Sequence, residues 1–132
     1  EAEEPIQVFS NRSLTKYKLV IDDIGGWQQF QKILKALSEI SKKHDASLAQ
    51  TALAWTLGQT GVAAVIVGAT SNRHLEENLQ VFDLSLDAED HTKLANLIQL
   101  SNPLEGDCFD LERDKNGRHG SIMKYNENSN ES

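Results

Sequence analysis

The sequence predicts an α/β protein that is mostly helical and contains one strand of the parallel type. Apolar residues recur at three- and four-residue steps in several segments, which is the spacing of one helix face. One short run, residues 62–67, is entirely apolar and mostly Val or Ile, as expected for a strand buried on both faces. Helical segments stand before and after this run, so the chain alternates between the two kinds of element.

The composition excludes several classes of function. The chain has 132 residues, enough for one domain, and no apolar run of membrane-spanning length, so we expect no membrane partner. Its net charge of −7 argues against a nucleic-acid partner, which needs a basic surface. Cys108 is the only cysteine, which excludes an internal disulfide and a cysteine-built zinc site, and we predict no metal site.

The first two segments are a loop and a helix. Residues 1–26 carry turn residues and a short apolar patch, so we expect a loop segment that ends at the pair Gly25-Gly26. A helix is predicted from Trp27 to His44. Its apolar residues share one face: Trp27, Phe30, Ile33, Leu34, Leu37 and Ile40.

A second helix is predicted from Ser47. Ser47 with Gln50 three residues later has the spacing of a capping box. The run LAQTALAWTLGQ is rich in Ala and Leu, which favour helices. This helix is expected to end near Gly58 or Gly61.

The apolar run 62–67 lies between Gly61 and Gly68. Periodicity alone does not distinguish a buried strand from a buried helix here. The short length, the branched side chains and the flanking glycines favour the strand.

Two more helices and a tail follow. One helix is predicted from about Ser71 to residue 81, and another begins at Asp87, a residue type favoured at the N-cap. The pair Asn102-Pro103 closes the last helix. Beyond it the periodicity disappears, so we expect a partly disordered tail whose last eight residues are disordered.

The sequence predicts several helices but only one strand, which is too few strands for a sheet. A parallel strand needs neighbours on both sides, and the sequence offers no clear partner for residues 62–67. The simplest inference is that the chain is a piece of a larger α/β domain. The alternative is that it folds alone as a mostly helical unit.

The turn after Gly68 suits a phosphate. A strand, a glycine, a polar turn and a helix start can hold one, because the first N–H groups of a helix lack internal partners and its dipole favours an anion. The polar residues here are Thr70, Ser71, Arg73, His74, Glu77 and Asn78. The amide of Asn78 both donates and accepts, which suits a base edge. The alternative is an ordinary joint, with Ser71 as N-cap and Arg73 as a solvated charge.

Four motifs occur between residues 47 and 97. They are S-x-x-Q-x-A-L-A-W in a helix, an apolar run ending in V-G-A, an H-L-x-E-N helix, and L-x-x-E-D opening the next helix. In this order and spacing they resemble the C-terminal part of the aldo-keto reductases, a family of NADP-dependent oxidoreductases.

The resemblance implies the C-terminal fragment of a (β/α)₈ TIM barrel, which binds NADP(H) at its C-terminal face. Residues 1–26 would be a loop segment, 27–102 the C-terminal part of the barrel with 62–67 as its eighth strand, and 103–132 the tail. The cofactor-binding residues that the resemblance implies are Gly68, Ala69, Thr70, Ser71, His74, Glu77 and Asn78.

One departure concerns the choice of cofactor. Many members of the family carry Arg or Lys at or just after the position of Gly68, and here Thr70 takes one such place. Without that cation the 2′-phosphate loses its strongest partner. The family implies NADP, and NAD is the alternative.

The catalytic groups of the family are expected to lie outside this chain. The family uses Asp, Tyr, Lys and His from the first half of the barrel, with Tyr as general acid and hydride from the nicotinamide. Lys16, Tyr17, Lys18 and His44 have suitable side chains but do not lie in the family's motifs, so we assign no catalytic residue. We expect them to be loop residues and an exposed helix-end histidine, and His119 to be an exposed loop histidine.

The resemblance thus implies the cofactor-binding part of an NADP(H)-dependent carbonyl reductase, catalytically incomplete by itself. The alternative is a non-enzymatic helical interaction or nucleotide-binding module derived from the family. The expected partners are a nicotinamide dinucleotide, a small carbonyl substrate only in the full-length parent, and proteins that cover exposed barrel surfaces. The expected location is cytoplasmic, with the plastid as the alternative, and the sequence does not name the substrate.

Overall fold

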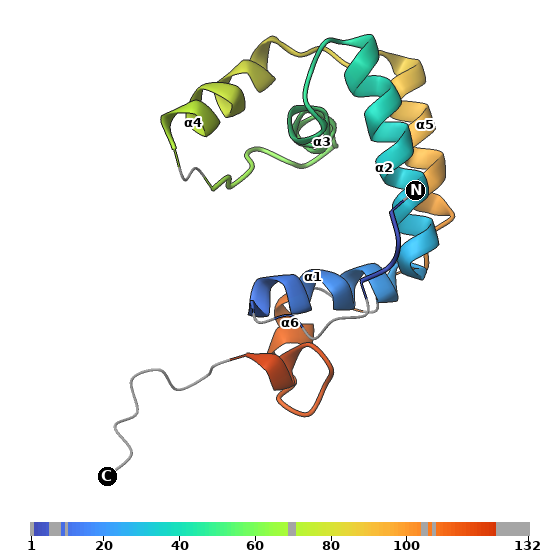
Figure 1. Cartoon of the computed structure of the whole chain (residues 1–132), viewed down its shortest axis with the longest axis vertical. Helices are drawn as coiled ribbons and strands as arrows, with labels where there is room; N and C mark the ends of the chain where they lie inside the picture. The colour runs from blue at the N-terminus through green and yellow to red at the C-terminus, as the bar shows by residue number, and fades with distance from the viewer. Residues whose placement is uncertain are drawn as a thin grey trace. The chain divides into compact units, whose positions relative to one another are not determined.

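The computed structural model describes residues 2–5, 9, 11–68, 71–103, 106 and 108–123. The helices are α1 (Arg12–Asp23), α2 (Gly26–Lys43), α3 (Leu48–Leu57), α4 (Asn72–Leu79), α5 (Ala88–Gln99) and α6 (Cys108–Arg113), with the 3₁₀ turns η1 (Gln80–Asp83) and η2 (Gly120–Ile122) (Figure 1). The chain divides into two compact units, Gln31–Leu100 and Glu1–Phe30 with Ser101–Ser132. No helix in the described ranges has both the length and the apolar content that crossing a membrane requires.

The predicted strand is wrong. Residues 62–68 are irregular, and no strand occurs anywhere in the described part of the chain. Ile66 is fully exposed and Val67 is 41% exposed, so this run is not buried on two faces. A strand exists only where its N–H and C=O groups bond to a neighbour, and the described residues supply no such ladder. The expectation of an α/β barrel fragment is therefore contradicted, and the described fold is helical.

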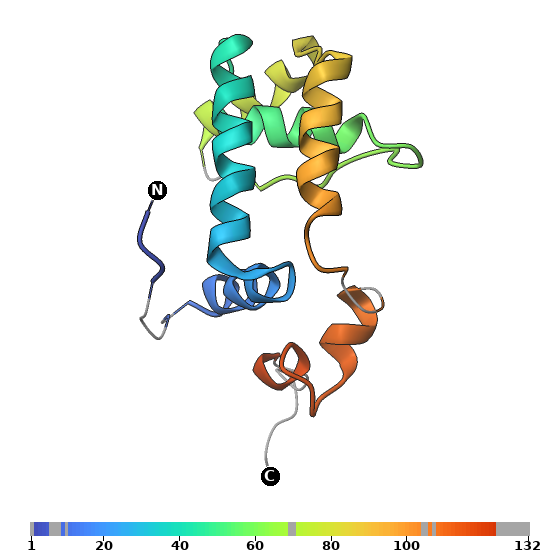
Figure 2. The same ribbon diagram turned by 90° about the vertical axis from the view of Figure 1, so that its right-hand side faces the viewer.

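Two antiparallel helices form the centre of the unit Gln31–Leu100. Helices α2 and α5 lie side by side, and Figure 2 shows α3 crossing them. The buried core consists of Ala36, Ile40 and Leu94, one small and two large side chains from the facing surfaces of α2 and α5. Partly buried residues surround it: Leu37, Trp55, Leu86 and Leu97. Their apolar area, removed from water, is the main favourable term that holds this unit together.

Helix α3 is attached to α2 by a buried polar contact. The hydroxyl oxygens of Ser41 and Thr51 lie 2.8 Å apart, and both residues are buried. Each hydroxyl also lies within hydrogen-bonding distance of the backbone carbonyl four residues earlier, Leu37 for Ser41 and Ser47 for Thr51, so the hydroxyl that accepts in this contact can donate to its own carbonyl. Satisfied hydroxyls of this kind avoid the cost of burying an unpaired polar group.

The helices predicted in this unit are confirmed, and so are their caps. Ser47 accepts from the backbone N–H of Gln50 and completes a capping box with it. Ser71 caps α4, and Asp87 caps α5 by accepting two backbone N–H groups. Gly58 ends α3 as predicted. In α4 and η1, Val81 is buried, whereas Leu75, Leu79 and Phe82 remain exposed.

The other unit contains a helix where a loop was expected. Helix α1 occupies Arg12–Asp23, and the side chain of Asn11 caps it by accepting from the N–H of Ser13. Lys18 and Asp22, one turn apart, form an ion pair along it. The break after this helix is confirmed. Gly25 and Gly26 have φ values of 122° and 80°, which side chains with a Cβ rarely adopt.

Residues 108–123 are more ordered than the sequence predicted. They form α6 and η2, and Arg118 and His119 both contact the carboxylate of Asp23 at the end of α1. His119 is buried, so the prediction of an exposed loop histidine is wrong. The expected disorder of the last eight residues falls outside the described residues.

Candidate functional site

The N-terminus of α4 is the first candidate site. Ser71 has extended backbone angles, φ −152° and ψ 161°, and its hydroxyl accepts from the N–H of His74 at 3.4 Å. This cap satisfies one of the N–H groups that a helix start leaves without an internal partner. The positive end of the helix dipole coincides with this point, which favours an anion.

The helix places three of the candidate residues on one face. His74, Glu77 and Asn78 are spaced by three and four residues, so their side chains lie one above another. All three are half-buried, whereas the intervening Leu75 and Glu76 are exposed. The face therefore runs from the capping Ser71 along the less exposed side of the helix.

The remaining candidates precede the helix. Gly68 is the last described residue before it, and a Cβ added there would meet no atom within 4 Å. Ala69 and Thr70 lie outside the described residues, as does the side chain of Arg73. The structure thus brings together four of the seven candidates on or next to α4, namely Ser71, His74, Glu77 and Asn78. Gly68 precedes the helix and has open space around the position of a Cβ.

A buried glutamine joins this helix to α3. The Oε1 atom of Gln50 accepts from the N–H of Ser47 at 2.8 Å. Its Nε2 atom donates to the carbonyl of Glu77 at 2.9 Å and to Oε1 of Gln80 at 3.0 Å. The sequence predicted the contact with Ser47 from local spacing, but the contacts with α4 and η1 join residues 27 and 30 positions apart and leave no local signal.

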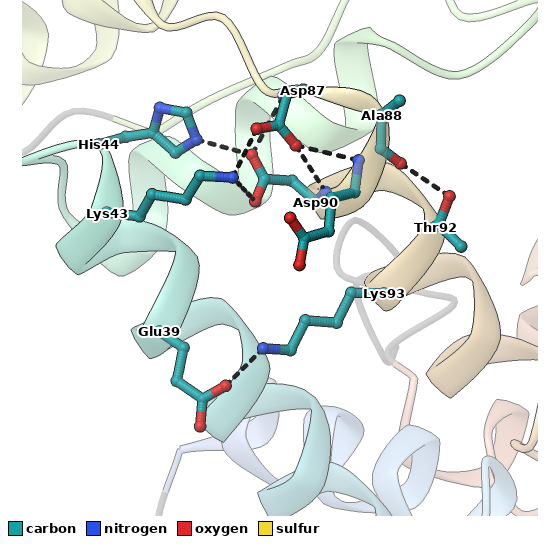
Figure 3. A network of polar contacts seen from close by, with 9 residues as sticks. Glu39, Lys43, His44, Asp87, Ala88, Asp90, Thr92 and Lys93 are labelled. Atoms are coloured by element: carbon teal, nitrogen blue, oxygen red, sulfur yellow. Dashed lines mark hydrogen bonds and ion pairs between the residues drawn. The ribbon is translucent and has the colours of Figure 1, made fainter.

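A second polar cluster lies where the end of α2 meets the start of α5 (Figure 3). The ammonium of Lys43 donates to Asp87 at 2.5 Å and to Asp90 at 2.9 Å. The Nε2 atom of His44 lies 2.6 Å from the second oxygen of Asp90. His44 is therefore a half-buried, bonded residue, and the prediction of an exposed helix-end histidine is wrong.

The cluster shifts the pKa values of its charged groups. Burial of Asp90 opposes its ionisation, but hydrogen bonds from His44, Lys43 and the backbone of Asp87 outweigh burial and lower its pKa to about 2. The two carboxylates raise the pKa of Lys43 well above its usual range, mainly through their hydrogen bonds. The ammonium of Lys43 and the two carboxylates thus stabilise the ionised state of each other.

The same cluster contains atoms that can ligate a metal. One nitrogen of His44 and one oxygen each of Asp87 and Asp90 lie within 4.8 Å of one another. The ammonium of Lys43, however, already bonds both carboxylates. A divalent cation would have to displace it, so the geometry fits a helix-to-helix contact better than a metal centre.

The lysine and histidine side chains of the types that the family uses in catalysis also contact carboxylates. Lys16 pairs with Glu112, and Lys18 pairs with Asp22 and Glu4. In the other unit His44 pairs with Asp90. These residues lie on helix α1 and at the end of α2, rather than in a loop as expected for Lys16, Tyr17 and Lys18.

Comparison with known proteins identifies the family. The model of the aldo/keto reductase family matches residues 1–99. The chain belongs to the aldo/keto reductase family. This match confirms the resemblance seen in the motifs between residues 47 and 97. The family is one of oxidoreductases that use nicotinamide cofactors.

Several curated relatives are similar over part of the chain. Methylglyoxal reductase DkgB of Escherichia coli O157:H7 is 40% identical over 70 residues, which is 52% of this chain and 26% of the relative. Aldo-keto reductase str7 of Strobilurus tenacellus is 30% identical over 97 residues, 71% of this chain and 26% of the relative. L-glyceraldehyde 3-phosphate reductase of Escherichia coli O157:H7 is 40% identical over 50 residues, 38% of this chain and 14% of the relative.

The chain spans about a quarter of the length of the first two of these relatives. No solved structure matches it significantly.

Proposed function

We propose that the chain is the C-terminal, cofactor-binding part of an NADP(H)-dependent aldo-keto reductase that reduces carbonyl compounds by hydride transfer. One observation carries this proposal. In a chain of this family, Ser71 caps α4 and His74, Glu77 and Asn78 follow on one half-buried face. A capped helix N-terminus offers N–H groups and a positive dipole to a phosphate, and Asn78 offers an amide to a base.

In this proposal the adenosine end of the dinucleotide lies along the start of α4. Gly68, with open space where a Cβ would be, lets the ligand approach the backbone closely. Ala69 would contact the ligand with its backbone, and Thr70 with its backbone and hydroxyl groups. The bound group would supply hydride, and the residues of this chain would hold and orient it.

We further propose that the chain does not reduce carbonyls by itself. Lys16 and Lys18, which are chemically suited to tune a general acid, are ion-paired with carboxylates, and His44 is hydrogen-bonded to Asp90, each inside its own unit. Tyr17, the residue type that would act as the acid, is an exposed side chain of α1. The small carbonyl substrate and the choice of substrate would belong to the full-length parent.

Calorimetric titration tests the binding claim. NADPH and 2′,5′-ADP are expected to bind the purified chain, and NADH more weakly because it lacks the 2′-phosphate. Ser71→Ala and Arg73→Glu are expected to weaken NADPH binding, whereas Glu89→Gln, an exposed charge change at the start of α5, serves as control. Equal binding of NADPH and NADH would contradict the preference for NADP, and turnover by the chain alone would contradict catalytic incompleteness.

A second candidate function is a non-enzymatic helical module derived from the family. The observation that favours it is the core of Ala36, Ile40 and Leu94, which the unit Gln31–Leu100 builds from its own helices. Such a module would melt cooperatively as an isolated chain and would bind its partner without cofactor. A circular dichroism melt with and without NADPH distinguishes the two functions.

Protein partners would use exposed apolar side chains. Exposed large apolar residues occur on α4, in η1 and in the irregular segment before α4, among them Ile66, Leu79 and Phe82. Such residues favour association when they cluster.

The single cysteine agrees with a reducing compartment, and we propose a cytoplasmic location on that ground.

A further inference from the structure

Both polar atoms of the Gln50 side chain are hydrogen-bonded. The residue is only 9% exposed. The oxygen accepts from the N–H of Ser47, at the cap of its own helix. The nitrogen reaches out of the helix to the carbonyl of Glu77 and the side chain of Gln80.

These bonds attach the far end of α4 to the start of α3. Glu77 stands in the last turn of α4, and Gln80 begins the 3₁₀ turn that follows. The apolar side chains Leu75 and Leu79 of the same helix are exposed, and the buried apolar residue next to it is Val81 in the 3₁₀ turn that follows. The described side chains of this eight-residue helix include no buried apolar one, so its position depends on the attachments at its C-terminal end, which are Val81 and the hydrogen bonds of Gln50.

We propose that Gln50 is a positioning residue for the dinucleotide site, which it serves by fixing α4 on α3 without touching the ligand. This inference rests on the proposed function. Because Glu77 and Asn78 both belong to the attached turn, a helix that moves would carry these two groups away from the ligand. A binding face gains affinity when its groups are already held in place before the ligand arrives.

The substitution Gln50→Glu separates this role from helix capping. A glutamate three residues after Ser47 still accepts from its N–H, so the capping box is retained. The carboxylate cannot donate, however, and it would face the carbonyl of Glu77. Ser47→Ala is the opposite variant, because it removes the hydroxyl cap and leaves the amide of Gln50 intact. Gln99→Glu, at the exposed end of α5, repeats the charge change elsewhere.

Two measurements test the role. In calorimetry we expect Gln50→Glu to weaken NADPH binding at least tenfold, while Ser47→Ala and Gln99→Glu change it less than twofold below their melting temperatures. In amide hydrogen exchange we expect Gln50→Glu to speed exchange in α4 relative to α5, and Ser47→Ala not to do so. If Gln50→Glu does not fold, Gln80→Ala removes one of the two attachments and is expected to act in the same direction, more weakly.

The outcomes separate this role from the proposed function. NADPH binding by the unaltered chain that persists unchanged in Gln50→Glu and Gln80→Ala would overturn the positioning role alone. Weakening by Ser47→Ala to the same extent would also overturn it, because the effect would then follow from helix stability. Absence of NADPH binding by the unaltered chain would overturn the proposed function and the positioning role together.

Discussion

The Nε2 atom of His44 lies 2.6 Å from the carboxylate of Asp90, which also accepts the ammonium of Lys43 at 2.9 Å. Asp90 is 3% exposed and additionally accepts from the N–H of Asp87 within its own capping box. One carboxylate thus joins the C-terminal end of α2 to the N-terminal end of α5. The contact links the two helices that carry the core.

Replacement of Asp90 by asparagine is expected to destabilise the protein. The substitution keeps the shape but removes the charge and gives up strong acceptor positions, so we expect a loss of about 2 kcal/mol in the free energy of unfolding. Urea denaturation followed by far-ultraviolet circular dichroism measures it. Glu89→Gln, a neighbouring exposed carboxylate, is the control, and an equal loss in both variants would contradict a special role for Asp90.

The same carboxylate predicts a dependence of stability on pH. Its pKa is lowered from 3.8 to about 2 in the folded state, so its contribution is fully present above the unfolded value and lost as pH falls. A difference of this size corresponds to about 2 kcal/mol, lost mainly between about pH 4 and pH 2. Unfolding measured across this window should show a shallower loss in Asp90→Asn. Parallel curves for the two proteins would show that other carboxylates dominate.

Truncation of the core leucine tests where the stability of the unit Gln31–Leu100 originates. Leu94 is 2% exposed and packs with Ala36 and Ile40. Leu94→Ala is expected to cost about 2–5 kcal/mol, because it leaves a cavity between α2 and α5. Leu100→Ala, where the side chain is 75% exposed, is expected to cost less than about 0.5 kcal/mol. Similar melting temperatures for both variants would mean that this unit lacks a packed core.

The end of α3 approaches α5 closely at a glycine. A Cβ on Gly58 would lie 2.8 Å from Cε1 of His91, a contact that the ring must move to relieve. When His91 is retained, Gly58→Ala is expected to lower the free energy of unfolding by about 1 kcal/mol. The cost should vanish when His91 is also replaced by alanine. A cost that is independent of His91 would place the strain elsewhere.

Local signals predicted the helices of the unit Gln31–Leu100 well. Caps and breaks depend on neighbouring residues, so Ser47, Ser71, Asp87 and the pair Gly25-Gly26 could be identified from spacing alone. The sequence missed α1, because the turn residues and the short apolar patch of residues 1–26 favoured a loop. It also missed α6, because six residues are too few to show a helical period.

Contacts between distant residues could not be predicted in the same way. The bond of His44 to Asp90 joins residues 46 positions apart, and that of Gln50 to Glu77 joins residues 27 apart. The strand prediction was wrong for a related reason. The branched side chains of residues 62–67 suit a buried sheet, but composition does not supply the neighbouring strand that a sheet requires.

The most direct test of the central claim is to map NADPH binding on the isotopically labelled chain by nuclear magnetic resonance. We expect amide shift changes concentrated at Gly68 and from Ser71 to Asn78, with α1 and α6 unaffected. Saturation of these changes with added NADPH would give the affinity directly. Shift changes absent from α4, or concentrated in the cluster of Lys43, His44 and Asp90, would contradict the assignment of the cofactor site.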